Sequence, residues 1–258
     1  MTETGQQPDI YGQVHPEESA ELISKKLIEF DAAVEALSAQ EKENITKAVE
    51  KCPELLTEAF KLQFLRCEVF QEDLAAKRYS NYWDKRVALF GPEKAFQKLT
   101  QDEALKDDTA ALSNEFFRLV GTKDPSGRNI ILGDPSKQDH EAIPTDSMAR
   151  AIWYVFHAAL EDETTQQKGW IILAYPQKAR VKQFNRDLMK IITSSIKGCI
   201  PGKRDSCVCV PNYQSALKRI LTPAPLCYLC SSPAIWYTYL PSTYLFQHCF
   251  PNYQAIFW

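Results

Sequence analysis

The sequence predicts an N-terminal α-helical module followed by a mixed α/β domain, and three observations support this fold class. Residues 170–175 form a short apolar run, and residues 207–210 form a second one. The amphipathic stretch between them has the length of one helix with its loops, which is typical of a βαβ crossover joining two parallel strands. Before residue 91, apolar side chains recur at helical spacing, which predicts the helical module.

The helical module is expected to contain four helices. Pro16 suits the first position of a helix, and Ser38 with Glu41 has the spacing of a capping box that opens a second helix. Pro53 is expected to open a third helix. A fourth is expected to end at Gly91, because glycine commonly follows the last helical turn. Four amphipathic helices of this kind predict a small bundle.

A β-hairpin is expected to begin the α/β domain. Two apolar segments, residues 116–121 and 128–133, flank a turn that contains Asp124 and Gly127. Glycine adopts the positive φ that such turns require, and an aspartate side chain can accept hydrogen bonds from the turn backbone. We therefore assign both residues structural roles. A helix from Pro144 to Leu160 is expected next, before the first strand of the crossover.

The first strand of the crossover is expected to be apolar on both faces. Because alternate side chains of a strand point to opposite faces, Trp170, Ile172 and Ala174 share one face, and Ile171 and Leu173 share the other. Two apolar faces are typical of a parallel strand covered on both sides. The next helix carries an apolar stripe at steps of four residues, which by itself is typical of core packing. The stripe comprises Phe184, Leu188, Ile192 and Ile196, with Ile200 beyond it.

Composition and charge argue against several classes of partner. The 258 residues carry a formal net charge of −3, and no basic run is interleaved with aromatic residues, so nucleic acid is not an expected partner. Residues 1–14 are polar and without periodicity, which predicts a disordered tail. The N-terminal stretch also lacks the apolar segment of a secretory signal, so a cytoplasmic protein is expected.

No catalytic motif is present in the sequence. It has no glycine-rich phosphate loop, no Gly-x-Ser-x-Gly and no His-Glu-x-x-His. The four histidines lie in unrelated contexts, and His157, within an apolar helix, is expected to be a core or rim residue rather than a base. We therefore expect a protein that is not an enzyme and that needs no cofactor.

The cysteine pairs offer a metal site as an alternative. Cys207 and Cys209, with Cys227 and Cys230, could supply the four ligands that zinc prefers, and His248-Cys249 lies further on. The first pair, however, alternates on an expected strand and lacks the tight turn that usually presents paired thiolates. No metal is therefore expected.

Several segments, in chain order, are similar to a known family. Residues 64–70 (Phe-Leu-Arg-Cys-Glu-Val-Phe) have the form Phe-Leu-Arg-x₃-Phe, and residues 82–86 (Tyr-Trp-Asp-Lys-Arg) give the next helix an aromatic and basic end. Asp124, Gly127 and Arg128 occupy the places of a hairpin turn of the form Asp-x₂-Gly-Arg. Over roughly residues 50–210 the chain thus resembles the CRAL-TRIO lipid-binding family, which includes phosphatidylinositol-transfer-like proteins.

The resemblance implies a lipid-exchange domain in which one sheet face and neighbouring helices enclose an elongated apolar cavity. At ~0.8 kcal/mol per buried CH₂, sheltering a sixteen-carbon chain contributes on the order of 12 kcal/mol before ordering costs. A dry apolar cavity is therefore sufficient for binding. By motif position, the residues that would face the ligand are Ile152, Phe156, Trp170, Ile172, Ala174, Phe184, Ile192, Ile196, Ile200, Cys207 and Cys209.

The chain departs from the family pattern in two places. Members that bind phosphatidylinositol commonly have Glu after the proline that corresponds to Pro201, whereas this chain has Gly202. Lys203 and Arg204 are instead expected to form a rim that touches an anionic membrane surface or headgroup. After about residue 210 the resemblance ends, and the long helix that gates the cavity in the family has no counterpart.

The last stretch of the chain, residues 211–258, is rich in cysteine, proline and aromatic residues, and no Asp or Glu follows Asp205. Its uncharged window 226–246 approaches the ~20 residues of a membrane span, but its prolines argue against a spanning helix. We expect this stretch to be non-native sequence, such as an out-of-frame or intron-derived translation, so that the lipid-exchange domain is truncated at its C-terminal end.

The expected domains are a disordered tail (1–14), a helical module (15–99), an incomplete lipid-binding domain (100–210) and an atypical tail (211–258). The expected function is non-enzymatic binding, and transfer between membranes, of a lipid or other small hydrophobic ligand by a cytoplasmic protein that docks transiently on membranes. The alternative is a scaffold or interaction module, or an inactive truncated product that lacks the gate helix.

Overall fold

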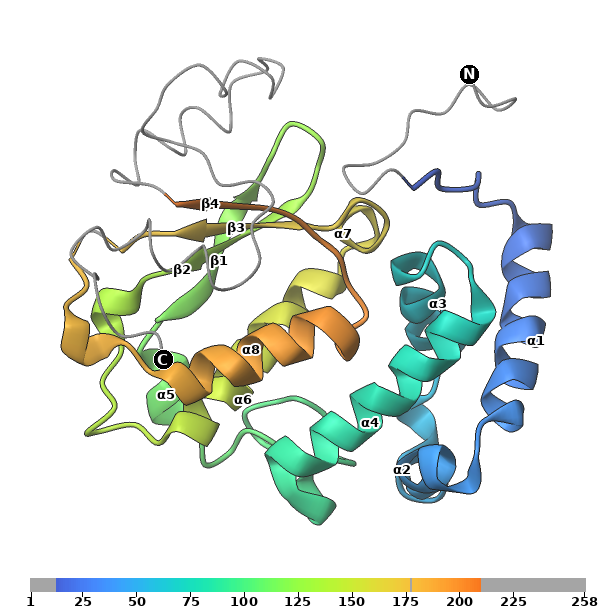
Figure 1. Cartoon of the computed structure of the whole chain (residues 1–258), viewed down its shortest axis with the longest axis horizontal. Helices are drawn as coiled ribbons and strands as arrows, with labels where there is room; N and C mark the ends of the chain where they lie inside the picture. Colours follow the sequence, from blue (N-terminus) through green and yellow to red (C-terminus); the bar gives the residue numbers. More distant parts are fainter. Residues whose placement is uncertain (1–12, 177, 210–258) are drawn as a thin grey trace, which may run out of the picture. The chain divides into compact units, whose positions relative to one another are not determined.

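The computed structural model of the chain describes residues 13–176 and 178–209 (Figure 1). For Val181 and for residues 204–209 it describes the backbone alone. The described residues form two compact units, one made of 13–106 with 194–203 and the other of 107–193 with 204–209. The predictions made for residues 1–12 and 210–258, including the zinc ligands there and the membrane span, lie outside the described residues.

The first unit is helical. Its helices begin where a side chain accepts a hydrogen bond from an otherwise unpaired backbone N–H: Ser19 for the first, Ser38 for the second and Thr57 for the third. The predicted capping box is confirmed, because Glu41 Oε2 also accepts from Ser38 N at 3.0 Å. The elements are α1 (Ala20–Ala36), α2 (Ala39–Lys51), a 3₁₀ turn (Pro53–Leu55), α3 (Glu58–Cys67) and α4 (Glu72–Lys94).

Two helix starts differ from the sequence predictions. Helix α1 begins after Ser19 rather than at Pro16, because the Ser19 side chain provides the cap. Pro53 opens the 3₁₀ turn rather than α3, because Thr57 caps that helix separately. At Gly91, where the fourth helix was predicted to end, the backbone leaves the helical conformation with φ 81°, and one more turn follows.

Aromatic side chains form the core of the first unit. Phe64 meets Tyr79 and Tyr82 edge to face, with ring centroids 5.0 Å and 5.5 Å apart. Trp83 stacks on Phe96 at 5.8 Å. Such pairs stabilise a fold beyond the area that they bury. Tyr79, Tyr82 and Trp83 of α4 are therefore buried in this core.

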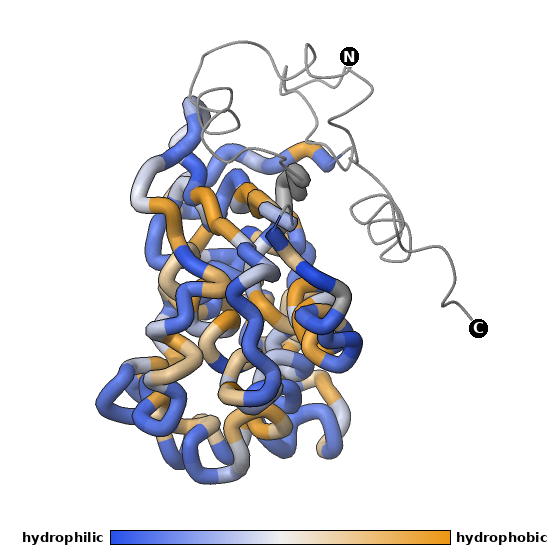
Figure 2. Tube along the Cα trace, turned by 90° about the vertical axis from the view of Figure 1, so that its left-hand side faces the viewer, coloured by the Kyte–Doolittle hydropathy of each residue, from blue (hydrophilic) through white to orange (hydrophobic). Residues whose placement is uncertain are grey.

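The second unit combines helices with a sheet. Its elements are α5 (Thr109–Ser113), β1 (Phe117–Lys123), β2 (Asn129–Gly133), a 3₁₀ turn (Pro135–Lys137), α6 (Thr145–Leu160), α7 (Glu163–Lys168), β3 (Trp170–Ala174), a 3₁₀ turn (Val181–Gln183), α8 (Arg186–Gly198) and β4 (Arg204–Cys209). Helix α8 begins in this unit, and its last turn counts with the first unit. Apolar stretches, orange in Figure 2, alternate with hydrophilic ones along the chain.

The described strands form one four-stranded sheet in the order β1-β2-β3-β4. Strands β1 and β2 pair antiparallel as the predicted hairpin, whereas β2 with β3 and β3 with β4 pair parallel. The βαβ crossover of β3, α8 and β4 is thus confirmed, and so is the mixed α/β fold class. Strand β3 ends at Ala174 rather than at the predicted Tyr175.

Candidate functional site

The two faces of β3 differ in what they pack against. Ile171 and Leu173 belong to a buried cluster with Ile130 and Leu132 of β2. The opposite face carries Trp170, Ile172 and Ala174, as the alternation predicted. In the parallel register, Ile172 lies beside Ile131, and Ala174 lies beside Gly133. This second face of β3 is the candidate functional surface, and we call it the Trp170 face.

Helix α6 lies against the Trp170 face. Phe156 is fully buried, and its ring centroid lies 5.0 Å from that of Trp170 and 5.3 Å from that of Phe117. Ile152, one turn earlier on α6, is 1% exposed. The structure therefore brings predicted ligand-facing residues of α6 and β3 into one closely packed apolar layer.

The start of α8 is fixed by polar contacts to the start of α6. Asn185 Oδ1 accepts hydrogen bonds from the backbone N–H groups of Asp187 and Leu188, which caps α8. Its Nδ2 donates to Thr145 Oγ1 at 2.8 Å, at the first residue of α6. Leu188 is fully buried. Helices α6 and α8 are thus held together at their N-termini.

The remaining predicted ligand-facing residues lie in different surroundings. Phe184 is half-buried before α8, and Ile192 is buried within it. On β4, the backbones of Cys207 and Cys209 pair in register with those of Ile172 and Ala174 on β3. The other two predicted residues, half-buried Ile196 and buried Ile200, belong to the first unit.

One buried donor on the Trp170 face has no hydrogen-bond partner within the described part of the chain. This is Nε1 of Trp170, whose residue is 0% exposed. The indole N–H only donates, and leaving such a group unpaired costs about 1–3 kcal/mol. An oxygen acceptor on a ligand would satisfy it. Trp83 Nε1 in the first unit is in the same situation, so the observation alone does not mark a site.

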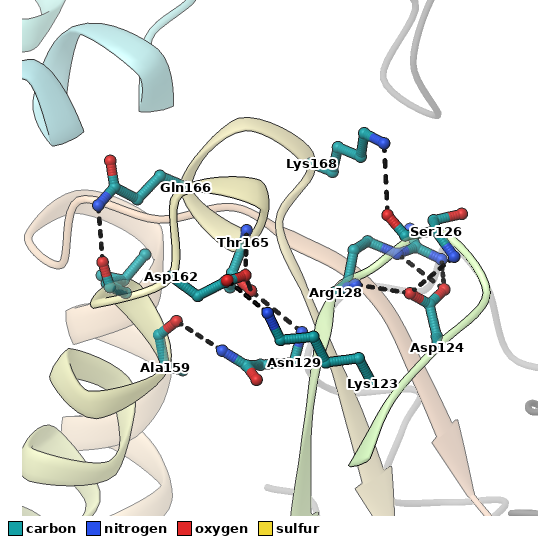
Figure 3. A network of polar contacts seen from close by, with 11 residues as sticks. Lys123, Asp124, Ser126, Arg128, Asn129, Ala159, Asp162, Thr165, Gln166 and Lys168 are labelled. Carbon is teal, nitrogen blue, oxygen red and sulfur yellow. Dashed lines mark hydrogen bonds and ion pairs between the residues drawn. The ribbon is translucent and has the colours of Figure 1, made fainter. Parts of the chain in front are cut away.

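A polar network supports the turn of the β1–β2 hairpin (Figure 3). Asp124 Oδ1 accepts from the backbone N–H groups of Ser126 and Arg128, and its Oδ2 accepts from the Arg128 guanidinium at 2.7 Å. Gly127 has φ 83°, as the predicted turn requires. Both carboxylate oxygens of Asp124 are occupied by these contacts. The structural roles predicted for Asp124 and Gly127 are confirmed.

The same network joins the hairpin to α7. Thr165 Oγ1 accepts from Asn129 N at 3.0 Å and donates to Asp162 Oδ2 at 2.8 Å (Figure 3). Asp162 also pairs with Lys123 at 2.5 Å. These interactions lower the pKa of the Asp162 carboxyl although burial, the largest single effect, opposes the decrease. The cluster fixes the geometry of one end of the sheet.

Asp108, immediately before α5, is the second buried acid with complete partners. It is 0% exposed and accepts hydrogen bonds from Ser147 Oγ at 2.7 Å and from Arg150 Nε at 2.8 Å. Arg150 Nη2 contributes a further contact at 2.7 Å. Because both oxygens bind donors from α6, this cluster has the features of a structural ion pair that anchors α6.

His157 and the proposed rim residues lie in the following surroundings. His157 stacks on Trp153 of its own helix, with centroids 5.7 Å apart, and its Nδ1 lies 2.7 Å from the Trp153 carbonyl oxygen. Lys203 is half-buried and donates to Gln13 Oε1 at 2.5 Å. For Arg204 only its backbone pairing with Trp170 is described. The membrane rim assigned to Lys203 and Arg204 stays a prediction.

Within residues 13–176 and 178–209, no group of three or more His, Cys, Asp or Glu side chains is placed to bind a metal ion. The helices in this described part of the chain are each too short or too polar to span a bilayer.

Sequence patterns did not reveal all the residues that position the helices. Asn185 was not identified from the sequence as the cap of α8, although Asn before an apolar helix is a common cap. Three residues of α4, namely Arg78, Asn81 and Lys85, contact the end of α8. They belong to the polar side of an amphipathic helix, where sequence alone predicts exposure to solvent.

Fold and site together define a mixed α/β protein with an apolar layer between β3 and α6. The chain is similar to proteins described as "Alpha-tocopherol transfer protein-like" from Homo sapiens and Pongo abelii, each 32% identical, and from Mus musculus, 31% identical, over 119 residues. The match covers 46% of this chain and 33% of each relative, so the chain spans about a third of the length of the relatives. No protein-family model matches the chain.

Proposed function

We propose that this protein binds a lipid or similar small hydrophobic ligand without chemical conversion and carries it between membranes. The observation that carries the proposal is the 32% identity over 119 residues to proteins named as tocopherol transfer protein-like. The motifs that resemble the CRAL-TRIO family support it independently, because they run in chain order through both units. We infer membership of that family from the two together.

The proposed ligand-binding surface is the Trp170 face with the helices beside it. In the second unit it comprises Ile152, Phe156, Trp170, Ile172, Ala174, Phe184 and Ile192, with Cys207 and Cys209 beside it on β4. Ile196 and Ile200 complete the proposed set. These side chains offer dispersion contacts and area burial, and the Trp170 indole offers one hydrogen-bond donor.

A carrier of this kind works by exchange at membranes and needs no reacting groups. The buried acids Asp108 and Asp124 are each occupied by arginine and backbone or hydroxyl donors, which supports a structural role for them. We propose that the protein acts in the cytoplasm, docks transiently on membranes, and uses Lys203 and Arg204 at an anionic surface. Phosphatidylinositol is one candidate ligand, and Gly202 argues against headgroup recognition through a glutamate at that position.

The test is uptake by the full-length protein. The purified chain is incubated with phosphatidylcholine vesicles that contain a pyrene-labelled sixteen-carbon fatty acid, separated from them, and analysed by native mass spectrometry. We expect about one ligand per chain, because a cavity of this class encloses a single lipophile. If no lipid is recovered from the purified protein and none is taken up from the vesicles, the proposal is refuted.

Two neighbouring residues of β3 provide a matched pair of variants. Ile172 lies on the Trp170 face, whereas Leu173 lies in the cluster on the opposite face, and both are buried. Ile172→Ala and Leu173→Ala remove the same number of carbon atoms and should each lower stability by about 2–5 kcal/mol. We expect Ile172→Ala alone to weaken ligand retention, by about tenfold. Equal weakening by both variants would contradict the assignment of the face.

The alternative function, a scaffold or interaction module, predicts a different result in the same samples. Such a protein would take up no pyrene lipid, and Ile172→Ala would change stability alone.

A further inference from the structure

Three side chains on one face of α4 bind the last turn of α8. Arg78, Asn81 and Lys85 are spaced three and four residues apart, so they project from the same side of the helix. All of these contacts lie within the first unit. Arg78 Nη1 donates to Ile200 O at 3.1 Å and to Ile196 O at 3.4 Å, and its Nη2 donates to Lys197 O at 3.1 Å. Asn81 Nδ2 donates to Gly198 O at 3.3 Å. Lys85 Nζ donates to Ser194 Oγ at 3.1 Å.

Most of these contacts are made to carbonyl groups at the C-terminal end of α8. The last four carbonyl groups of a helix have no partner within it, and this end carries the negative pole of the helix dipole. A guanidinium has several donors in a planar array and a permanent positive charge, so it satisfies both requirements at once. The Arg78 side chain is only 14% exposed, which strengthens its electrostatic interaction.

A second residue orients Arg78. Its Nε donates to Glu68 Oε1, and the Glu68 side chain is 18% exposed. Glu68 is the C-cap residue that follows α3, and after it Val69 and Phe70 adopt left-handed backbone conformations with φ 52° and φ 57°. Such conformations are costly for residues other than glycine. The buried Phe70 side chain and its N–H bond to Leu65 O at 2.7 Å hold this turn in place.

We propose that Arg78, oriented by Glu68, is a positioning residue that holds the C-terminal end of α8 and thereby slows the release of a bound lipophile. The proposal rests on the proposed function. Helix formation is cooperative, so an α8 whose last turn frays also holds Ile192, one turn earlier, less firmly. A few residues after α8 the chain enters β4, which pairs with β3, the strand that carries the Trp170 face.

The test compares three variants of the full-length chain. Arg78→Met removes the donors but keeps an apolar stem, and Arg78→Lys keeps the charge but not the planar array of donors. Lys77→Met is the matched control, because it removes one positive charge from the adjacent position of α4, where the lysine pairs with Glu41 of α2. Should Arg78→Met fail to fold, Glu68→Gln takes its place, since it leaves Arg78 without a charged partner.

The first measurement needs no ligand. Amide hydrogen exchange is followed in residues 194–203, where Cys199 N and Ile200 N both donate to Ser195 O. We expect exchange about tenfold faster in Arg78→Met, a smaller increase in Arg78→Lys, and no change in Lys77→Met. Unchanged exchange in Arg78→Met would show that the side chain does not hold the helix end, and it would overturn the proposal.

The second measurement is the rate at which the pyrene-labelled fatty acid leaves the protein for excess phosphatidylcholine vesicles. We expect release about tenfold faster from Arg78→Met, an intermediate rate from Arg78→Lys, and the wild-type rate from Lys77→Met. Faster exchange with unchanged release would reduce Arg78 to a structural role and overturn the proposal. If the wild type takes up no pyrene lipid, the proposed function and the role of Arg78 in retention both fail, while the exchange data still report whether Arg78 holds α8.

Discussion

In the first unit aromatic rings meet edge to face around Phe64, whereas in the second unit one face of β3 packs in an aliphatic cluster with β2 and the other combines aliphatic side chains with Trp170. Edge-to-face pairs depend on ring orientation, so the first core accepts few alternative arrangements. Contacts among Ile, Leu and Ala side chains are non-directional and can be made equally to a neighbouring side chain or to a hydrocarbon chain. This difference is consistent with the proposed positioning role of the helical unit and the proposed ligand binding at the sheet.

The largest effect is expected from Phe64→Ala. Phe64 is fully buried and contacts several rings, so the variant leaves a cavity in a core that cannot easily collapse, and stability should fall by about 3–5 kcal/mol. Urea unfolding followed by circular dichroism measures the change. Phe64→Leu, which keeps most of the volume, should cost clearly less. Similar losses for the two variants would show that ring orientation is not what stabilises the first unit.

The second effect concerns the ion pair between Arg66 and Glu18. The two side chains are 5% and 16% exposed, and Arg66 Nη2 lies 2.6 Å from Glu18 Oε2. Arg66→Met leaves a carboxylate with little solvent and no counter-charge, which should cost about 2–3 kcal/mol. The double variant with Glu18→Gln should regain part of this loss in the same unfolding assay. Strictly additive effects would contradict direct pairing.

The third effect distinguishes two glycines. Gly127 has φ 83°, and a Cβ there would lie 3.2 Å from Thr164 Cγ2, so Gly127→Ala should destabilise the protein by about 1–2 kcal/mol. Gly198, at the end of α8, has open space around it, and Gly198→Ala should stabilise the helix by about 0.5 kcal/mol. Differential scanning calorimetry of both variants measures the contrast. A stabilising Gly127→Ala would refute the need for glycine in the hairpin turn.

The smallest effect is a pH dependence at the start of α2. The hydrogen bond from Lys77, with further bonds within the capping box, lowers the pKa of Glu41 from 4.5 to about 2. Because the folded-state pKa is the lower one, this stabilisation is complete above pH 4.5 and is lost as the pH falls towards 2. The difference in melting temperature between wild type and Glu41→Gln should shrink through that window. Lys77→Met should reduce the pH dependence, and a constant difference would contradict the pairing.

Local signals predicted the parts of the fold that depend on neighbouring residues. Ser38 and Glu41 are three residues apart, and the turn at Gly127 needs only its own backbone, so both followed directly from the sequence. The alternation along β3 likewise separated the Trp170 face from the face of Leu173. These predictions succeeded because each rests on an interaction that the chain makes within a few residues.

Other features depend on residues far apart in the sequence. Arg78 contacts the carbonyl groups of Lys197 and Ile200, more than a hundred residues away, and Asp108 contacts Arg150, which lies 42 residues further along the chain. A polar residue on an amphipathic helix gives no sign of such a partner, because an exposed lysine or arginine produces the same pattern. The start of α3 was misplaced for a related reason, since Pro53 and Thr57 are both good helix openers and the structure uses Thr57.

The most direct test of ligand binding at the Trp170 face is photo-crosslinking with a diazirine-bearing sixteen-carbon fatty acid, followed by peptide mapping of the full-length chain. We expect adducts in α6 and β3, at residues 145–160 and 170–174, with fewer after Ile172→Ala and no decrease after Leu173→Ala. Adducts concentrated on the aromatic residues of α3 and α4, or distributed without preference over both units, would contradict ligand binding at this face.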